Sequence, residues 1–264
     1  MKFALVNGQR QEAQPNLSGE CLGCGRPMVA KCGEVRVRHW AHLGRRLCDP
    51  WWENETEWHR AWKDQFPADW QEIVHPAEDG ERHIADVKTD RGWVIEFQHS
   101  YLNPVERRSR DAFYPKLVWV VDATRRKRDG KTFDEALNNG ARRFGNVPIV
   151  QVRSDECALL REWVNSHASV FFDFGSEVFS WLIAGRADGP AYVGPISRAS
   201  FIEMHRGGVT KTARDFDALV KDFRGLVADY EAHLYARALQ QTSPQPLHGF
   251  QRYLSRRDRL RRRL

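Results

Sequence analysis

The chain has 264 residues, 41% of them hydrophobic and 29% charged, so it can bury one large core or two smaller ones. It contains no apolar run of about 18 residues, and the apolar stretch near residue 1 is too short for a signal peptide, so we expect a cytoplasmic protein without a membrane partner. Four of the five cysteines lie between residues 21 and 48, which favours metal binding over a disulfide framework.

The net charge of +6 is concentrated at the end of the chain. Residues 252–264 carry seven arginines and one aspartate, so the rest of the chain is neutral overall. Such a tail can contact the phosphates of a nucleic acid, or it can be a solvated segment without a partner. The basic run at 125–128, expected in a loop, has the same two interpretations. The candidate phosphate contacts of the tail are Arg256, Arg257, Arg259, Arg261, Arg262 and Arg263.

The first zone of the chain, residues 1–50, is rich in glycine and cysteine. Cys21-Leu22-Gly23-Cys24-Gly25 is typical of a zinc knuckle, in which two thiolates reach one tetrahedral ion and glycines permit the tight backbone. His42 and Cys48 have the most suitable spacing for the other two ligands, with His39 as the main substitute and Cys32 as a further alternative. The other interpretation is a pair of reduced, partly buried cysteines. A closed site of four ligands would be structural, and we expect a small zinc-ribbon-like module.

The second zone, residues 51–153, alternates helical and strand patterns. The spacing of its aromatic residues predicts a helix over 53–66, ended by Pro67. Asn103 as N-cap and Pro104 at the first helical position predict a second helix to about residue 114. The other predicted elements are strands at 71–75, 83–89, 93–100, 117–121 and 148–152 and a helix at 133–144. The order α-β-β-β-α-β follows, and the helix before the buried run at 117–121 allows a parallel crossover.

The hairpin between the second and third of these strands gathers polar residues. A three-residue loop with Gly92 in the left-handed position would place Asp86 opposite Glu96. Gln98 would then share their surface, while the reverse face of the hairpin forms a core. Directly opposed carboxylates repel, and either a shared proton or Mg²⁺ could offset this. The alternative is a pair of surface acids neutralised by Lys88 or Arg82.

The helix at 53–66 adds further candidate residues. Glu57 could supply another metal ligand, or it could be an exposed first-turn acid favoured by the helix dipole. His59 and Lys63 lie one turn apart on the flank of the helix. His99 should point away from the acids toward the core, so its expected role is structural.

The third zone, residues 154–264, is expected to be an α+β region. It contains a predicted buried strand at 170–174 and a helix at 211–240. The apolar positions of this helix repeat at helical spacing and form a packing face, either within the chain or against a second subunit. The zone ends in the basic tail, and no pattern in it selects a ligand.

These features together resemble the PD-(D/E)XK nuclease superfamily, which has an α-β-β-β-α-β, restriction-endonuclease-like core. Asp86 matches its first acid, Glu96 matches its second, and Gln98 stands where that superfamily usually has lysine. Within it, the chain is similar to the competence protein CoiA family over about residues 20–125, and more loosely at 170–175. The likeness rests on Cys-x-x-Cys at 21–24, HWAH at 39–42, EWH at 57–59 with Lys63, IADVKTDRGWVIEFQHS at 84–100, ERRSRDAFY at 106–114 and WVVD at 119–122.

The resemblance implies metal-dependent hydrolysis of DNA by a core at residues 51–153. Asp86, Glu96 and Glu57 would hold Mg²⁺ or Mn²⁺, in addition to the structural zinc. Gln98 cannot supply the positive charge of the usual lysine, so Lys63 or Lys88 would have to do so. The resemblance implies a role in DNA uptake, recombination or defence, with a homo-oligomer or another protein of that process as partner. The rival functions are a DNA-binding accessory protein with a degenerate site and an RNase.

Overall fold

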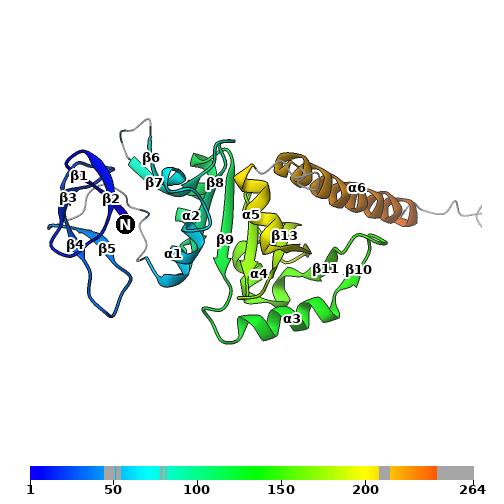
Figure 1. Cartoon of the computed structure of the whole chain (residues 1–264). Coiled ribbons are helices and arrows are strands. Elements are labelled where there is room, and N and C mark those ends of the chain that lie inside the picture. The colour runs from blue at the N-terminus through cyan, green and yellow to red at the C-terminus, as the bar shows by residue number, and fades with distance from the viewer. Residues whose placement is uncertain (45–50, 52–54, 78–79, 81, 208–214, 243–264) are drawn as a thin grey trace, which may run out of the picture. The chain divides into compact units, whose positions relative to one another are not determined.

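The computed structural model describes the chain except residues 45–50, 52–54, 78–79, 81, 208–214 and 243–264 (Figure 1). The described chain is mixed α/β, with two sheets and six α-helices. Residues Met1–Phe223 form one compact unit, and a second unit begins at Arg224. The predicted arginine contacts of the tail lie outside the described residues, so their role stays a prediction.

The first sheet is small and antiparallel, and it lies at the N-terminal end of the chain (Figure 1). Its strand order is β2-β1-β3-β4-β5, from β1 (Phe3–Val6), β2 (Gln9–Glu12), β3 (Ser18–Glu20), β4 (Pro27–Lys31) and β5 (His39–His42). Its core is short of large apolar side chains and centres on Met28 and Trp40, with Cys21 packed beside them. Such a small core has little hydrophobic stabilisation of its own.

The second sheet has nine strands in the order β10-β11-β14-β13-β12-β9-β8-β7-β6. The central strands β8, β9 and β12 are parallel, and the remaining pairs are antiparallel. The bounds are β6 (Gln71–Pro76), β7 (Arg82–Lys88), β8 (Val94–Gln98), β9 (Leu117–Asp122), β10 (Ala141–Arg142), β11 (Val150–Arg153), β12 (Ser169–Asp173), β13 (Val178–Gly185) and β14 (Pro190–Ser197). Strands from both sides of residue 153 belong to this sheet, so it continues across the boundary predicted there.

Helices cover both faces of this sheet. On one face, Trp119 and its neighbours form a core with residues of α3 and α4 and with Tyr114 at the end of α2. On the other face, Trp62 of α1 stacks on Phe97, and Phe201 of α5 meets Phe171 edge-on. The helices are α1 (Glu57–Lys63), α2 (Pro104–Phe113), α3 (Asp129–Asn139), α4 (Ala158–Trp163), α5 (Arg198–Arg206) and α6 (Phe216–Thr242), with short 3₁₀ turns at Ala68–Trp70 and Ser154–Glu156.

The predicted order α-β-β-β-α-β is confirmed by α1, β6, β7, β8, α2 and β9. Gly92 has a φ of 77°, Asn103 accepts a hydrogen bond from the backbone N–H of Val105, and β9 is buried along its whole length, all as predicted. The parallel crossover between β8 and β9 is also confirmed. Local turn and cap signals therefore position the hairpin that carries the acids.

Several element boundaries differ from the prediction. Helix α1 begins at Glu57, because Thr56 and His59 form a capping box at its start. Helix α3 covers 129–139 and not 133–144, because it gives way to extended backbone at Gly140. A Cβ atom at Gly140 would lie 2.4 Å from a methyl carbon of Val150, so this position has no room for a side chain.

The described part of the second unit is the segment of α6 from Arg224 to Thr242, which extends two residues beyond the end of the predicted helix 211–240. Its large exposed apolar residues are Leu226, Leu234, Tyr235 and Leu239. Among the helices that the structure describes, none combines the length and apolar character needed to cross a membrane.

Candidate functional site

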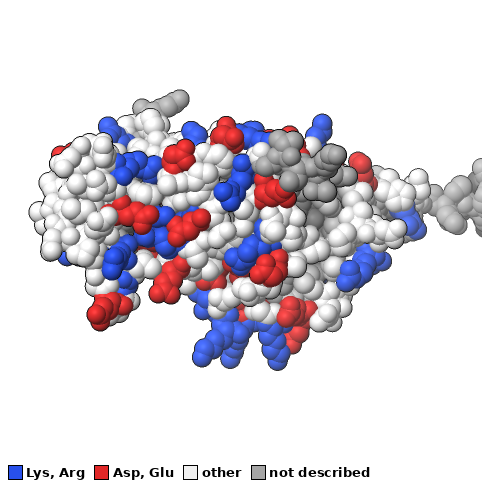
Figure 2. Space-filling model, viewed as in Figure 1, with Lys and Arg blue, Asp and Glu red and all other residues white. Residues whose placement is uncertain are grey.

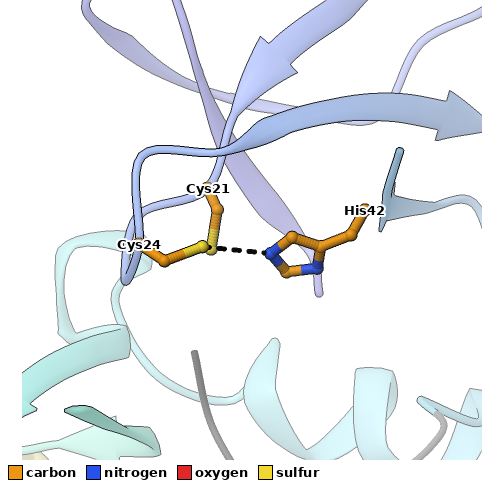
Figure 3. A group of neighbouring side chains, drawn as sticks. All are labelled: Cys21, Cys24 and His42. Atoms are coloured by element: carbon orange, nitrogen blue, oxygen red, sulfur yellow. Dashed lines mark hydrogen bonds between the residues drawn. The ribbon is translucent and has the colours of Figure 1, made fainter. Parts of the chain in front are cut away.

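The first candidate site is a metal-ligand group formed by Cys21, Cys24 and His42 (Figure 3). Their ligand atoms all lie within 4.8 Å of one another, and Cys24 Sγ is 3.4 Å from His42 Nε2. The cysteines come from the loop between β3 and β4. His42 reaches them because it pairs with Met28 across the β4–β5 ladder. The group could hold a metal ion, and its soft thiolates and imidazole match the ligands that zinc prefers.

The backbone around the two cysteines forms the predicted tight turn. Gly25 donates its N–H to the carbonyl of Cys21 at 2.9 Å and has a left-handed φ of 69°. The N–H of Cys21 in turn donates to the carbonyl of Arg26 at 2.9 Å. Arg82 of β7 donates to the carbonyl of Gly23, so the turn is tied to the nine-stranded sheet.

The structure selects among the predicted metal ligands. His39 bonds the carbonyl of Val37 at 2.8 Å, and neither His39 nor Cys32 belongs to the group. Cys48 lies outside the described residues. In the described part of the chain, this is the only set of three or more Cys, His, Asp or Glu side chains close enough to share a metal.

The second candidate site is the hairpin of β7 and β8. The ladder between them consists of the pairs Val87↔Ile95 and Lys88↔Val94 and ends before Asp86 and Glu96. Beyond it, a carboxylate oxygen of Asp86 accepts the backbone N–H of Phe97 at 3.0 Å. The prediction of directly opposed carboxylates on one surface is therefore wrong, because the paired register does not include these residues and Asp86 meets Lys63 of α1 whereas Glu96 meets Arg110 of α2.

Asp86 turns toward α1 and meets Lys63. The Nζ atom of Lys63 lies 3.1 Å from Asp86 Oδ1, 3.1 Å from Glu72 Oε1 and 3.3 Å from Glu55 Oε1. Burial opposes the charged form of Lys63, but the surrounding carboxylates of Asp86, Glu72 and Glu55 raise its pKa well above the usual value. The sequence predicted Lys88 or Arg82 as the cation that neutralises the acids. In the structure, Lys63 neutralises Asp86.

Glu55 and Glu72 are members of this site that the sequence did not reveal. Burial raises the pKa of both carboxyls, but nearby positive charges and hydrogen bonds together lower each pKa below its usual value: Lys63 and the amino terminus act on both carboxyls, and Arg60 also acts on Glu55. Glu72 has a φ of 48°, and its carboxylate accepts the backbone N–H groups of Lys2 at 2.6 Å and Phe3 at 2.9 Å. An acid in a strand gives no sequence signal of this left-handed conformation.

Glu96 and Gln98 face the opposite side of the sheet, toward α2. Glu96 is buried and pairs with Arg110 of α2 at 3.2 Å, and the Arg110 guanidinium lies 5.6 Å from the ring centre of Trp119. Gln98 is also buried and donates to the carbonyl of Ser100 at 3.2 Å. The two residues share a surface, as predicted, but Asp86 is not on it.

The other predicted residues of this region are placed as follows. Glu57 is exposed at the first position of α1, which matches its interpretation as a first-turn acid. His99 is not enclosed in the core: its side chain is 36% exposed, and its Nδ1 atom lies 2.6 Å from Asp122 Oδ2. The structure therefore brings together Asp86 and Lys63, but not Glu57, Glu96 or Gln98.

Comparisons of the chain with protein-family models, with curated proteins and with solved structures found no match.

Proposed function

We propose that the chain is a metal-dependent nuclease that hydrolyses DNA phosphodiester bonds, with a role in DNA uptake, recombination or defence against foreign DNA. The observation that carries this proposal is the ion pair between Lys63 and Asp86, 3.1 Å apart. It places a fixed positive charge beside the first acid of the hairpin, which Gln98 cannot do. A positive charge there can stabilise the negative charge that develops on a phosphoryl group under attack.

The residues present fit a divalent ion only in part. Asp86 suits Mg²⁺ or Mn²⁺, because its side chain is 20% exposed and such ions bind through one or two carboxylates together with water. Glu96 suits them less well, because its side chain is only 6% exposed and faces Arg110. A bound ion would polarise the phosphoryl oxygen and activate water. Asp86 would hold the ion, and Lys63 would fix the orientation of Asp86.

A second candidate function is DNA binding without cleavage, as a recombination accessory protein. One observation favours it: Lys63 and Arg110 already neutralise Asp86 and Glu96, so the acids need no metal to offset their charge. An RNase remains the third alternative, because phosphodiester chemistry alone does not select the sugar.

The test compares wild type with Asp86→Asn on plasmid, linear and single-stranded DNA and on RNA, with Mg²⁺, Mn²⁺ or EDTA. We expect Asp86→Asn to lower the cleavage rate by about 10³-fold, equivalent to about 4 kcal/mol of transition-state stabilisation. Asparagine keeps one oxygen for the N–H of Phe97, so the hairpin should remain folded. Asp90→Asn, in the exposed turn of the same hairpin, is the matched control and should cut like wild type.

Glu96→Gln decides the role of the second acid. Loss of cleavage would mean that Glu96 leaves Arg110 when substrate and metal bind, whereas retained cleavage would remove it from the site. A wild type that binds these substrates and cuts none of them would contradict the nuclease proposal and favour the binding protein.

Deletion of residues 252–264 tests the basic tail. The deletion removes six net positive charges, so we expect weaker DNA binding. A plot of the logarithm of the DNA-binding constant against the logarithm of the salt concentration should have a slope that is shallower by up to about 5. Titrations at several salt concentrations measure both effects. An unchanged slope would show that the tail does not contact phosphates.

A further inference from the structure

A row of polar side chains lies at the carboxyl ends of the three parallel strands. His99 directly follows β8, Asp122 ends β9, and Asp173 ends β12. The register pairs Gln98 with Val121 and Asp122 with Asp173, so the three residues occupy neighbouring positions across this edge. Ligands of open α/β sheets bind outside the carboxyl ends of parallel strands. The row therefore lies where the sheet can present side chains to a substrate.

His99 and Asp122 form an oriented pair. Asp122 Oδ2 lies 2.6 Å from His99 Nδ1, and Asp122 Oδ1 accepts hydrogen bonds from the N–H of Thr124 at 2.9 Å and its hydroxyl at 2.6 Å. Asp122 is thereby fixed, and its carboxylate assigns the ring proton of His99 to Nδ1. Nε2 is then left as a proton acceptor on a side chain that is 36% exposed. This is the arrangement that a general base requires.

Asp173 has a different role, because it anchors α1. Its Oδ2 atom accepts hydrogen bonds from the indole N–H groups of Trp58 at 3.0 Å and Trp62 at 2.9 Å. Trp58 lies beside the ring of His99, with 6.2 Å between ring centres. Lys63 lies five residues after Trp58, at the end of α1, and meets Asp86. The pair of Lys63 with Asp86 and the pair of His99 with Asp122 therefore lie on the same face of the sheet, along the same helix.

The loop that leaves this edge is basic. Within residues 125–128, Arg126 pairs with Asp129 at 2.7 Å and with Glu162, which anchors the loop. Lys127 and Arg128 are exposed, and the described part of the chain offers them no ion pair. Figure 2 shows Lys and Arg side chains gathered over the segment between β9 and α3, at the lower edge of the view. Cations without ion pairs, a few residues beyond Asp122, are suited to nucleic-acid phosphates.

We propose that this edge binds the nucleic-acid backbone and that His99 is the general base of the hydrolysis. The inference rests on the proposed nuclease function. His99 Nε2 takes a proton from water while the water oxygen bonds to phosphorus. The bond from phosphorus to the departing sugar oxygen breaks, and that oxygen takes a proton from solvent. The products are one phosphate-terminated end and one hydroxyl-terminated end. Asp122 is a positioning residue that holds the ring of His99.

His99→Asn is the first variant, because its amide can still donate to Asp122 but cannot act as the base. We expect a fall of about 10²- to 10⁴-fold in cleavage rate, with an unchanged Kd for DNA and an unchanged melting temperature. Asp122→Asn should cause a smaller loss of about 10- to 100-fold, because the ring is then less well oriented. A merely structural pair would instead lower the melting temperature and leave the rate per folded molecule unchanged.

The outcomes separate this inference from the proposed function. If Asp86→Asn is inactive and His99→Asn cuts like wild type, the nuclease stands and the role of His99 is overturned. If wild type cuts none of the substrates, the nuclease and the general base both fail, and the binding experiment decides whether the edge still holds DNA.

The binding experiment uses Lys127→Gln/Arg128→Gln with EDTA present. The matched control is Arg142→Gln/Arg143→Gln, which removes two exposed cations beyond the other end of α3. The loop variant should bind DNA at least about 10-fold more weakly at low salt. Its slope of the logarithm of the binding constant against the logarithm of the salt concentration should be shallower by about 2, whereas the control should keep nearly the affinity and slope of wild type. Equal effects of the two variants would overturn this edge as the binding surface.

Discussion

Replacement of Lys63 by methionine is expected to lower the free energy of unfolding by about 3–5 kcal/mol at neutral pH, because it removes the buried cation that Glu55, Glu72 and Asp86 share. Lys63 is only 4% exposed, and Asp86, Glu72 and Glu55 all lie within 3.3 Å of its Nζ atom. Methionine keeps most of the aliphatic chain, so the decrease in the free energy of unfolding reports the lost charge and not lost packing. Urea unfolding followed by circular dichroism measures this free energy.

The dependence on pH should distinguish the variant from wild type. In wild type the folded pKa values of Glu55 and Glu72 are depressed. Their stabilisation is therefore present above the unfolded pKa of about 4.3 and is lost as pH falls through the folded values. Without Lys63, burial and the repulsion between the two carboxylates should raise both pKa values, opposed only by Arg60 at Glu55 and by the amino terminus at both groups. The stabilisation that these carboxylates contribute at neutral pH would then be reduced.

The difference in stability between Lys63→Met and wild type should therefore shrink between pH 7 and about pH 4.5. Lys131→Met is the control, because Lys131 is an exposed partner of Glu135 on α3 and its loss should change stability by less than about 1 kcal/mol. A Lys63 variant as stable as wild type at pH 7 would contradict the charge balance described for this cluster.

The fold was predictable from the sequence where its signals are local. Gly92, Asn103 and the apolar run at 117–121 each specify a turn, a helix start or a buried strand within a few residues, and the structure confirms all three. The edges of the sheet were less predictable. Strand β11 pairs antiparallel with β14, which lies 40 residues further along the chain, and no short pattern encodes that pairing.

The candidate site shows the same limit more sharply. The alternation of side chains predicted one face for Asp86 and Glu96, but the ladder ends just before them. Glu72, beside Asp86 on the neighbouring strand, has a positive φ that interrupts the regular strand. Such an irregularity moves a side chain to the other face of a sheet. The sequence indicates Lys63 as a possible source of charge, but Glu72 and Asp86 become its partners only through the packing of α1 against β6 and β7.

Purified protein is expected to contain about one zinc per chain, and removal of that ion should unfold the N-terminal sheet. Small modules with little core commonly depend on a metal, and apparent zinc-binding free energies of about 10–16 kcal/mol are typical of structural sites. Elemental analysis measures the metal content. Hydrogen exchange at β3, β4 and β5, with and without a chelator, measures the unfolding. We expect the backbone amides of β3, β4 and β5 to lose their protection from exchange when zinc is removed.

Cys24→Ser and His42→Ala should abolish zinc binding, whereas Cys32→Ser and His39→Ala should retain it, because only Cys24 and His42 belong to the metal-ligand group.

Loss of zinc should also weaken the structure beyond the first sheet. Lys2 and Phe3 donate their N–H groups to Glu72, which pairs with Lys63, so a loosened β1 withdraws support from the buried ion cluster. Protection of β6 and β7 should therefore fall as well. A metal-free protein with full protection in both sheets would show that the cysteines are structural without a metal.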